Sequence, residues 1–267
     1  MKSQVNEFCE TYQLFKDDAI QQVQLEHRFR LAQAFEVEEG MRILEIGCGQ
    51  GDMTVVLADR VGESGHVTAI DIASGDYGSP LTLNQSHQQI MQTELGERID
   101  FHLETDLLTF DVAEHYDCVV FAHSSWYFHS PEALTRYFEK IRTITSKLLF
   151  AEWDLNYTQT SQRGHFSAVM LLALNSAIAR NDSNIQHLFS RETIKQMLKN
   201  SGFAIRKDRV VFSAYLQDGQ WEIEYATDVY SEFPTSSTQL HTLATSLYQV
   251  MKGSGKESLD TFVIIGT

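Results

Sequence analysis

Short apolar runs recur along the chain, and each is bounded by polar or glycine-rich residues. Near-continuous apolar runs of this length are typical of parallel strands that are buried on both faces of a sheet. On this pattern we predict strands at 41–47, 66–73, 98–104, 116–123, 147–154, 204–216 and 260–267.

Helical patterns lie between these runs. Ser130 and Pro131 precede apolar residues at helical spacing, which fits an N-cap followed by proline at the first helical position. Ser190 begins a second such pattern, which Gly202 ends, and a third spans 235–252. The alternation predicts an α/β fold with a doubly wound, mostly parallel seven-stranded sheet and an antiparallel last strand.

Two segments fall outside this alternation. Residues 1–36 have a helical pattern and predict an N-terminal cap on the sheet. Residues 156–189 contain a helix that is apolar almost all round, which suits a lid over a pocket, a contact in a homodimer or ordinary core packing. At 267 residues the chain is near the upper limit for one core, so we predict a single domain, 1–267, with these two additions.

A glycine-rich loop, "LEIGCGQG", follows the first predicted strand. Gly47, Gly49 and Gly51 alternate in it, and glycine at such a loop lets the backbone approach a ligand. A dinucleotide-binding loop has the spacing G-x-G-x-x-G, but Asp52 stands where its third glycine belongs. A carboxylate there would repel a pyrophosphate, so the loop disfavours an NAD-dependent oxidoreductase.

An acidic residue followed by G-x-G-x-G at a strand end resembles the first motif of the class I S-adenosylmethionine-dependent methyltransferases. The resemblance covers about residues 41–155, and the rest of the chain agrees only in topology. It implies that S-adenosyl-L-methionine is the cofactor and that Glu45 helps to hold its ammonium group. Asp71, in "AIDIA" at the end of the second strand, matches the family carboxylate that binds the ribose hydroxyls.

The third predicted strand is followed by "ETDLL". Asp106 there matches the family residue that faces the adenine amino group, and the Leu107 amide would face a ring nitrogen. The resemblance thus implies a cofactor site made of residues at four strand ends. Its members are Glu45, Gly47, Cys48, Gly49, Asp71, Ile72, Asp106, Leu107 and Ala122.

The methyl acceptor should lie above the ends of the fourth and fifth strands, "AHSSWYFHS" and "AEWDLNY". His123 is the candidate general base, since the ordinary histidine pKa of about 6.5 allows proton uptake near neutral pH; packing on the cofactor is the alternative. Glu152 and Asp154 offer carboxylates without a third oxygen ligand, so we expect no metal. Candidate substrate residues are Trp126, Tyr127, Trp153 and His165.

The composition of the chain excludes some classes of binding partner. The formal net charge is −15, which disfavours nucleic acid and membrane surfaces, and no two prolines are adjacent as in nucleic acid amine methylases. The first 20 residues contain no continuous apolar run, so we expect no signal peptide and a cytoplasmic protein. The sequence predicts a methyltransferase for a small molecule. The alternative is a cofactor-binding sensor or a non-catalytic partner subunit.

Overall fold

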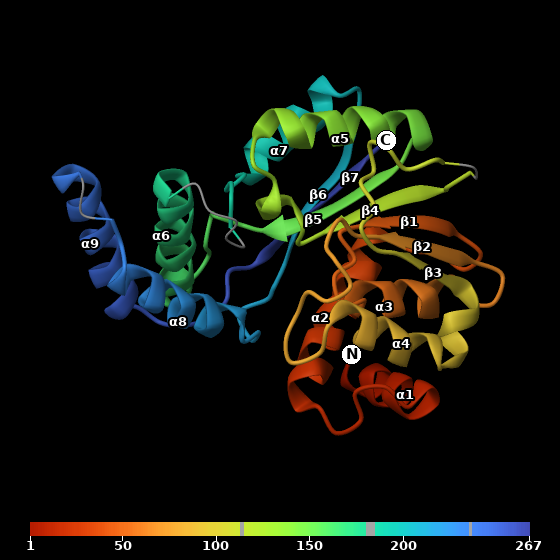
Figure 1. Ribbon diagram of the computed structural model, residues 1–267. Helices are drawn as coiled ribbons and strands as arrows, with labels where there is room; N and C mark the ends of the chain where they lie inside the picture. The colour runs from red at the N-terminus through yellow and green to blue at the C-terminus, as the bar shows by residue number, and fades with distance from the viewer. Residues whose placement is uncertain (113–114, 180–184, 235–236) are drawn as a thin grey trace.

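The computed structural model describes residues 1–267 except 113–114, 180–184 and 235–236. Within the described residues, seven strands form one sheet in the order β3-β2-β1-β4-β5-β7-β6 (Figure 1). Only the pairings of β7 with β5 and β6 are antiparallel. The strands are β1 (Arg42–Ile46), β2 (His66–Ile70), β3 (Ile99–His102), β4 (Cys118–Ala122), β5 (Leu148–Trp153), β6 (Ile205–Val211) and β7 (Thr261–Gly266).

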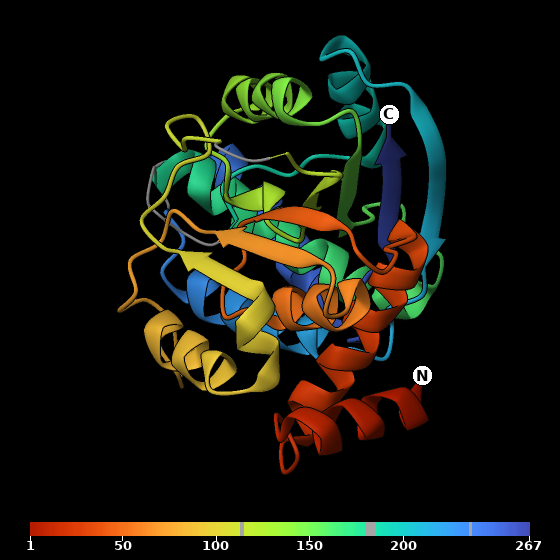
Figure 2. The same ribbon diagram turned by 90° about the vertical axis from the view of Figure 1, so that its right-hand side faces the viewer.

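Helices cover both faces of the sheet and one of its ends. Figures 1 and 2 show α5 and α7 on one face, and α2, α3 and α4 on the other. A third group, α6, α8 and α9, packs together beyond the tip of β5. The α-helices are α1 (Lys2–Tyr12), α2 (Ala19–Phe35), α3 (Asp52–Val61), α4 (Leu83–Met91), α5 (Pro131–Ile144), α6 (Arg163–Ala179), α7 (Arg191–Asn200), α8 (Asp218–Ser231) and α9 (Thr238–Lys252), and the 3₁₀ turns are η1 (Glu94–Arg98), η2 (Ser125–Tyr127) and η3 (Thr160–Gln162).

Alternate residues of the central strands pack on opposite layers. Val119 and Phe121 of β4 belong to the core cluster under α5 and α7. Cys118 and Val120 belong to the second cluster, under α2 and α3. Because side chains alternate across a strand, a strand with apolar layers on both sides needs the near-continuous apolar run that the sequence shows.

The predicted fold class is confirmed, including the antiparallel last strand. The Ser130 hydroxyl accepts a hydrogen bond from the Ala133 amide, and Ser190 does the same for Thr193, as their cap positions predicted. Helix α8 was not predicted from the sequence. The sequence pattern also assigned 204–216 to a strand, but β6 ends at Val211. Part of the predicted 156–189 insertion, residues 180–184, lies outside the described residues. No helix in the described part of the chain has the length and apolar character to cross a membrane.

Candidate cofactor and methyl-acceptor site

The loop after β1 places bare backbone at the crevice where the strand order switches. Gly47 and Gly49 have φ of 74° and 52°, a conformation that side chains disfavour. A Cβ on Gly47 would lie 2.6 Å from the Cβ of Ser124, so this glycine lets the loop after β4 pack closely. At Gly49, no described residue other than its chain neighbours comes within 4 Å of the Cβ position. Gly49 is therefore the glycine that leaves room for a ligand.

Asp71 ties the end of β2 to this loop. One carboxylate oxygen accepts a hydrogen bond from the Gly49 amide and the other from the Ala73 amide, both at 2.8 Å. Each oxygen has a further lone pair, which leaves the carboxylate able to accept from two hydroxyl donors. The next side chain, Ile72, is 69% exposed, as expected for an apolar contact to a ligand at this edge.

Glu45 is buried beneath the loop, and its carboxyl accepts a 2.6 Å hydrogen bond from the Thr54 hydroxyl. Burial raises the pKa of Glu45 to about 8, against the opposing effects of the Thr54 hydroxyl and the Arg28 guanidinium. A buried carboxyl of this kind is relieved by a positive charge, and the ammonium group of the cofactor's methionine part would supply one.

Asp106 and Leu107 follow β3, as predicted. The Oδ1 atom of Asp106 accepts hydrogen bonds from the Tyr137 hydroxyl at 2.6 Å and from the Leu108 amide at 2.9 Å. Leu107 is buried in the core cluster under α5. The carboxylate is thus held in one orientation by a residue of α5, a contact that no local sequence pattern indicates.

Arg28 of α2 adds a positive charge to this region. Its charge acts on Glu45 and Asp52, yet among the described residues it forms no ion pair. Its Nε is buried and has no hydrogen-bond partner there either. A guanidinium with unused donors suits a carboxylate, and the methionine part of the cofactor carries one beside its ammonium group. Arg28 is not predicted from the sequence because it precedes the glycine loop by some twenty residues and belongs to no motif.

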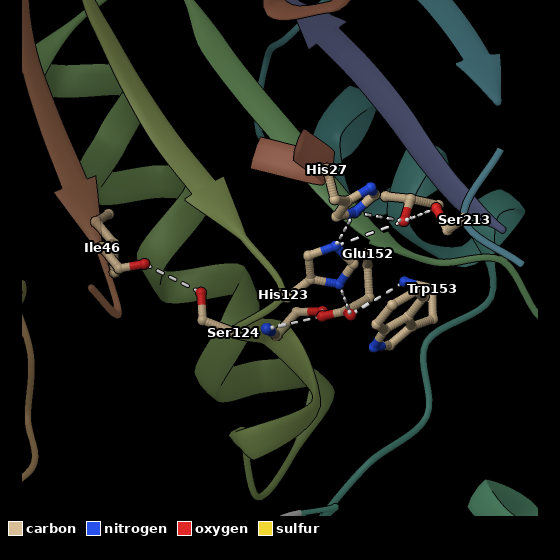
Figure 3. Close-up of polar contacts among 9 residues, drawn as sticks. His27, Ile46, His123, Ser124, Glu152, Trp153 and Ser213 are labelled. Carbon is tan, nitrogen blue, oxygen red and sulfur yellow. Dashed lines mark hydrogen bonds and ion pairs between the residues drawn. The ribbon is translucent and has the colours of Figure 1, made fainter. Parts of the chain in front are cut away.

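His123 stands at the end of β4 with a positive φ of 53°, which is uncommon for a residue with a side chain. Its Nδ1 lies 3.3 Å from the Glu152 carboxylate of β5 (Figure 3). Its Nε2 lies 3.3 Å from Nε2 of His27 and 3.5 Å from the Thr261 hydroxyl. Strained backbone kept in place by several contacts is a common property of functional sites.

Glu152 anchors this group. Its Oε2 accepts hydrogen bonds from the amide and the hydroxyl of Ser125, and its Oε1 accepts one from the Trp153 amide. The neighbouring Ser124 turns the other way and donates to the Ile46 carbonyl at the end of β1 (Figure 3). The loop after β4 therefore connects the His123 group directly to the strand that carries the glycine loop.

Two of the predicted substrate residues join His123 in one aromatic cluster. The ring centroids of Trp153 and His123 are 4.4 Å apart, and those of Trp153 and His165 are 5.6 Å apart. His165 of α6 is fully buried, and its Nδ1 accepts a hydrogen bond from the Leu259 amide. Burial lowers the pKa of His165 to about 3, so this imidazole is neutral.

The other two predicted substrate residues differ in exposure. Trp126 is buried in the core, whereas Tyr127 is 52% exposed. Although the Tyr127 ring is accessible, enclosure by the surrounding protein raises the pKa of its hydroxyl, and Tyr77 and Glu222 add to the effect. Glu222, from the unpredicted helix α8, is near enough for its charge to act on Tyr127, and burial and the charge of Asp218 raise the pKa of Glu222 to about 7.

Comparisons with known proteins identify the family of the chain. A family model described as a methyltransferase domain matches residues 19–208. A crystal structure of a cyclopropane-fatty-acyl-phospholipid synthase-like protein from Lactobacillus casei is 37% identical, with a TM-score of 0.91, and covers 100% of both chains. The cyclopropane synthase MmaA2 from Mycobacterium tuberculosis has a TM-score of 0.58 at 15% identity, covering 100% of this chain and 95% of its own, which shows the fold alone.

A curated relative, methyltransferase phomM from Diaporthe leptostromiformis, is 32% identical over 117 residues. That alignment covers 37% of this chain and 30% of the length of the relative. Because the family model spans most of the chain, the protein belongs to the methyltransferase domain family, of class I, whose cofactor is S-adenosyl-L-methionine. The predictions of family and cofactor are confirmed. The assignment of individual site residues stays a prediction.

Proposed function

We propose that the protein transfers the methyl group of S-adenosyl-L-methionine to a small molecule bound at the ends of β4 and β5. The observation that carries this proposal is the buried group of His123, Glu152 and Trp153 at those ends, joined through Ser124 to the β1 loop. The bound cofactor supplies an electrophilic methyl group on a sulfonium. Alignment of the acceptor with the S–CH₃ bond contributes much of the rate, on the order of 7–11 kcal/mol of the barrier in favourable cases.

Some residues that hold the cofactor belong to sequence motifs, whereas Arg28 is brought to the site by the tertiary fold. Glu45 binds its ammonium group, Arg28 its carboxylate, and Asp71 the two ribose hydroxyls, while Asp106 faces the adenine. The bare backbone at Gly49 and the unpartnered Nε of Arg28 support this fit. Cys48, Ile72 and Ala122 border the same crevice in this proposal, together with Gly47 and Leu107.

His123 is the general base of the proposal. Its Nδ1–H faces the Glu152 carboxylate, so the lone pair available to accept a proton is on Nε2. The Glu152 charge would stabilise the imidazolium that forms. Burial lowers the pKa of His123, although Glu152 opposes this, so the ring is neutral and able to accept a proton at neutral pH.

A cavity lined by apolar side chains is the candidate binding site for an apolar part of the methyl acceptor. This cavity of about 820 Å³ is lined by Leu155 and His129, from the loops after β5 and β4, and by residues of α6 and α9. Its apolar lining includes Met170, Leu174 and Leu247. The group of α6, α8 and α9 would then act as the lid over the acceptor. The lid assignment predicts that amide exchange in α6 slows when cofactor and acceptor bind; exchange that is already slow without them would favour core packing.

A methyl-transfer screen tests the function. The protein is incubated with methyl-labelled cofactor and a library of amines, phenols, carboxylates and thiols, each with and without a long apolar tail. We expect transfer to a subset, with tailed members preferred, and loss of transfer in His123→Ala. Tight cofactor binding without transfer to any class would favour the alternative of a cofactor-binding sensor or partner subunit.

A further inference from the structure

The nitrogen of His123 that would accept a proton is in contact with two residues from distant parts of the chain. His27 comes from α2, near the N-terminus, and Thr261 begins β7, near the C-terminus. The Thr261 hydroxyl lies 3.2 Å from Nε2 of His27, in addition to its 3.5 Å approach to Nε2 of His123. His27 and Thr261 are both fully buried. Neither was indicated by any motif.

The direction of the hydrogen bonds follows from the network around Thr261. The Ser213 hydroxyl donates to the Val211 carbonyl at 3.0 Å, so its oxygen can only accept from the Thr261 hydroxyl, also at 3.0 Å. The Thr261 oxygen then has lone pairs left for a donor, and Nε2 of His27 is the atom that fits. We therefore assign a hydrogen to His27 Nε2, shared between Thr261 and the lone pair of His123.

This assignment is consistent with the surroundings of the Nδ1 atom in both imidazole rings. A hydrogen on Nε2 of neutral His27 leaves its Nδ1 bare, and that Nδ1 is buried without a partner among the described residues. A bare nitrogen there costs less than an unpaired N–H donor would, because no buried donor is left unsatisfied. In His123 the hydrogen is on Nδ1, where the Glu152 carboxylate accepts it.

The charged and titratable groups around His123 come from four elements. Glu152 of β5 raises its pKa, while burial and the Arg28 charge of α2 lower it, and Asp218 of α8 acts in the same direction as Glu152. His165 of α6 is neutral. Burial lowers the pKa of His27 most strongly, so His27 is neutral as well and acts as a hydrogen-bond donor rather than as a charge.

We propose that His27 and Thr261 are positioning residues that control the proton-accepting nitrogen of His123. In the resting state the Nε2–H of His27 occupies the lone pair of His123. When the acceptor binds, its N–H or O–H bond breaks and the proton forms a bond to His123 Nε2. With cofactor bound, the electron pair freed on the acceptor would form the bond to the methyl carbon as the S–CH₃ bond breaks, and the electron pair of that bond would stay on sulfur. A small rotation of the His27 ring then directs its Nε2–H to the Thr261 oxygen alone. This inference rests on the proposed function, in which His123 is the base.

The two residues should have opposite effects on His123. Loss of the His27 donor frees the lone pair of His123 and favours its protonation. Loss of the Thr261 oxygen leaves the His27 hydrogen with His123 alone, which disfavours protonation. From the net strength of one hydrogen bond, each change should shift the pKa of His123 by roughly 0.5–1 unit, upward for His27→Phe and downward for Thr261→Val.

The test is NMR of the full-length protein with ¹⁵N-labelled histidine, since the ring nitrogen shifts report both tautomer and pKa without any substrate. The parent should show His123 with its hydrogen on Nδ1 and His27 with its hydrogen on Nε2. His27→Phe should raise the pKa of His123 and Thr261→Val should lower it. His27→Gln, which keeps a donor, and Thr261→Ser, which keeps the hydroxyl, should stay near the parent. Thermal unfolding and cofactor affinity verify folding; if His27→Phe does not fold, the Thr261 pair provides the test.

The outcomes separate this inference from the proposed function. An unchanged pKa of His123 in both His27→Phe and Thr261→Val, or a His123 hydrogen on Nε2 in the parent, overturns the positioning role. If the NMR shifts occur as expected and the acidic limb of the rate profile moves with them, both proposals are supported. If the NMR shifts occur but the acidic limb does not move, the hydrogen-bond assignment holds and His123 is not the base.

Discussion

The two halves of the sheet's carboxyl edge are built in different ways. Around β1, β2 and β3, the candidate cofactor residues other than Arg28 lie at the strand ends or in the loops that follow, and hydrogen bonds such as that from the Gly49 amide to Asp71 connect neighbouring loops. Around β4 and β5, the site instead gathers residues from α2, β7, α6 and α8, far apart in the sequence. The first half can bind a constant ligand with local loops. The second must fit a variable acceptor and depends on the helices packed over it.

This difference predicts that variants of the two halves fail differently: those near β4 should lose turnover and those near β1 and β2 should lose cofactor affinity. The largest effect is expected for His123→Ala. Removing a general base should lower kcat by roughly 10²–10⁴-fold, with cofactor affinity nearly unchanged. Steady-state kinetics and calorimetry measure the two quantities, and His66→Ala, a histidine at the start of β2, is the control.

The pH dependence sharpens the same prediction. In the parent, activity should fall as pH drops through the pKa of His123, because imidazolium cannot accept a proton. That pKa is lowered by burial, so the acidic limb should lie below the usual histidine range. Parent-level activity of His123→Ala at every pH would remove His123 from the mechanism and leave Tyr127 or proximity as the better account.

Asp71→Ala should have the next largest effect, on affinity. It removes two hydrogen bonds to ribose and the two that order the loop, for a loss of roughly 2–4 kcal/mol in cofactor binding. Calorimetry with S-adenosylhomocysteine measures it. Asp76→Ala, an exposed aspartate of the same loop, is the matched control. Equal affinities in Asp71→Ala and the parent would show that the ribose assignment is wrong.

Arg28→Met should weaken cofactor binding by roughly ten- to a hundredfold, the value of a hydrogen-bonded charge pair. The sharper measurement compares two ligands: S-adenosylhomocysteine, which has the carboxylate, and 5′-methylthioadenosine, which lacks it. Only the first should bind less tightly to the variant. Arg30→Met, on the same helix but paired with Glu26, serves as the control. A similar loss for both ligands would mean that Arg28 supports the fold rather than the carboxylate.

An effect of opposite sign, on stability rather than on turnover or cofactor affinity, is expected for Glu45→Gln. The folded-state pKa of Glu45 is raised to about 8, so its stabilising protonated form is lost as pH rises from the unfolded value to that pKa. Over this window the parent should lose up to about 1.4 kcal/mol of stability per pH unit relative to the variant. Urea unfolding at pH 6 and pH 8 without cofactor measures it, with Glu97→Gln as control. Stability curves that run parallel would contradict the buried-carboxyl account.

The sequence alone determined the fold class and predicted which residues gather at the carboxyl ends of β1, β2 and β3. Apolar runs such as that of β4 are dictated by burial on both faces, and the caps Ser130 and Ser190 are local hydrogen bonds. Glu45 lies near the end of β1, and Asp71 and Asp106 follow β2 and β3, so parallel topology brings them to one edge wherever the rest of the chain goes. These features depend on residues that are close in the sequence or on a repeated strand–helix unit. Both can be recognised from the sequence pattern.

Only the tertiary structure brought His27, Thr261, Arg28 and Glu222 to the site. Helix α2, which belongs to the N-terminal cap, packs against β7, and antiparallel β7 lies beside β5, so residues 27 and 261 meet at His123. Their hydrogen bonds, and the burial that keeps both histidines neutral, depend on packing between elements rather than on spacing along the chain. A sequence pattern carries no information on such contacts, because the partner's identity is set by where the elements dock.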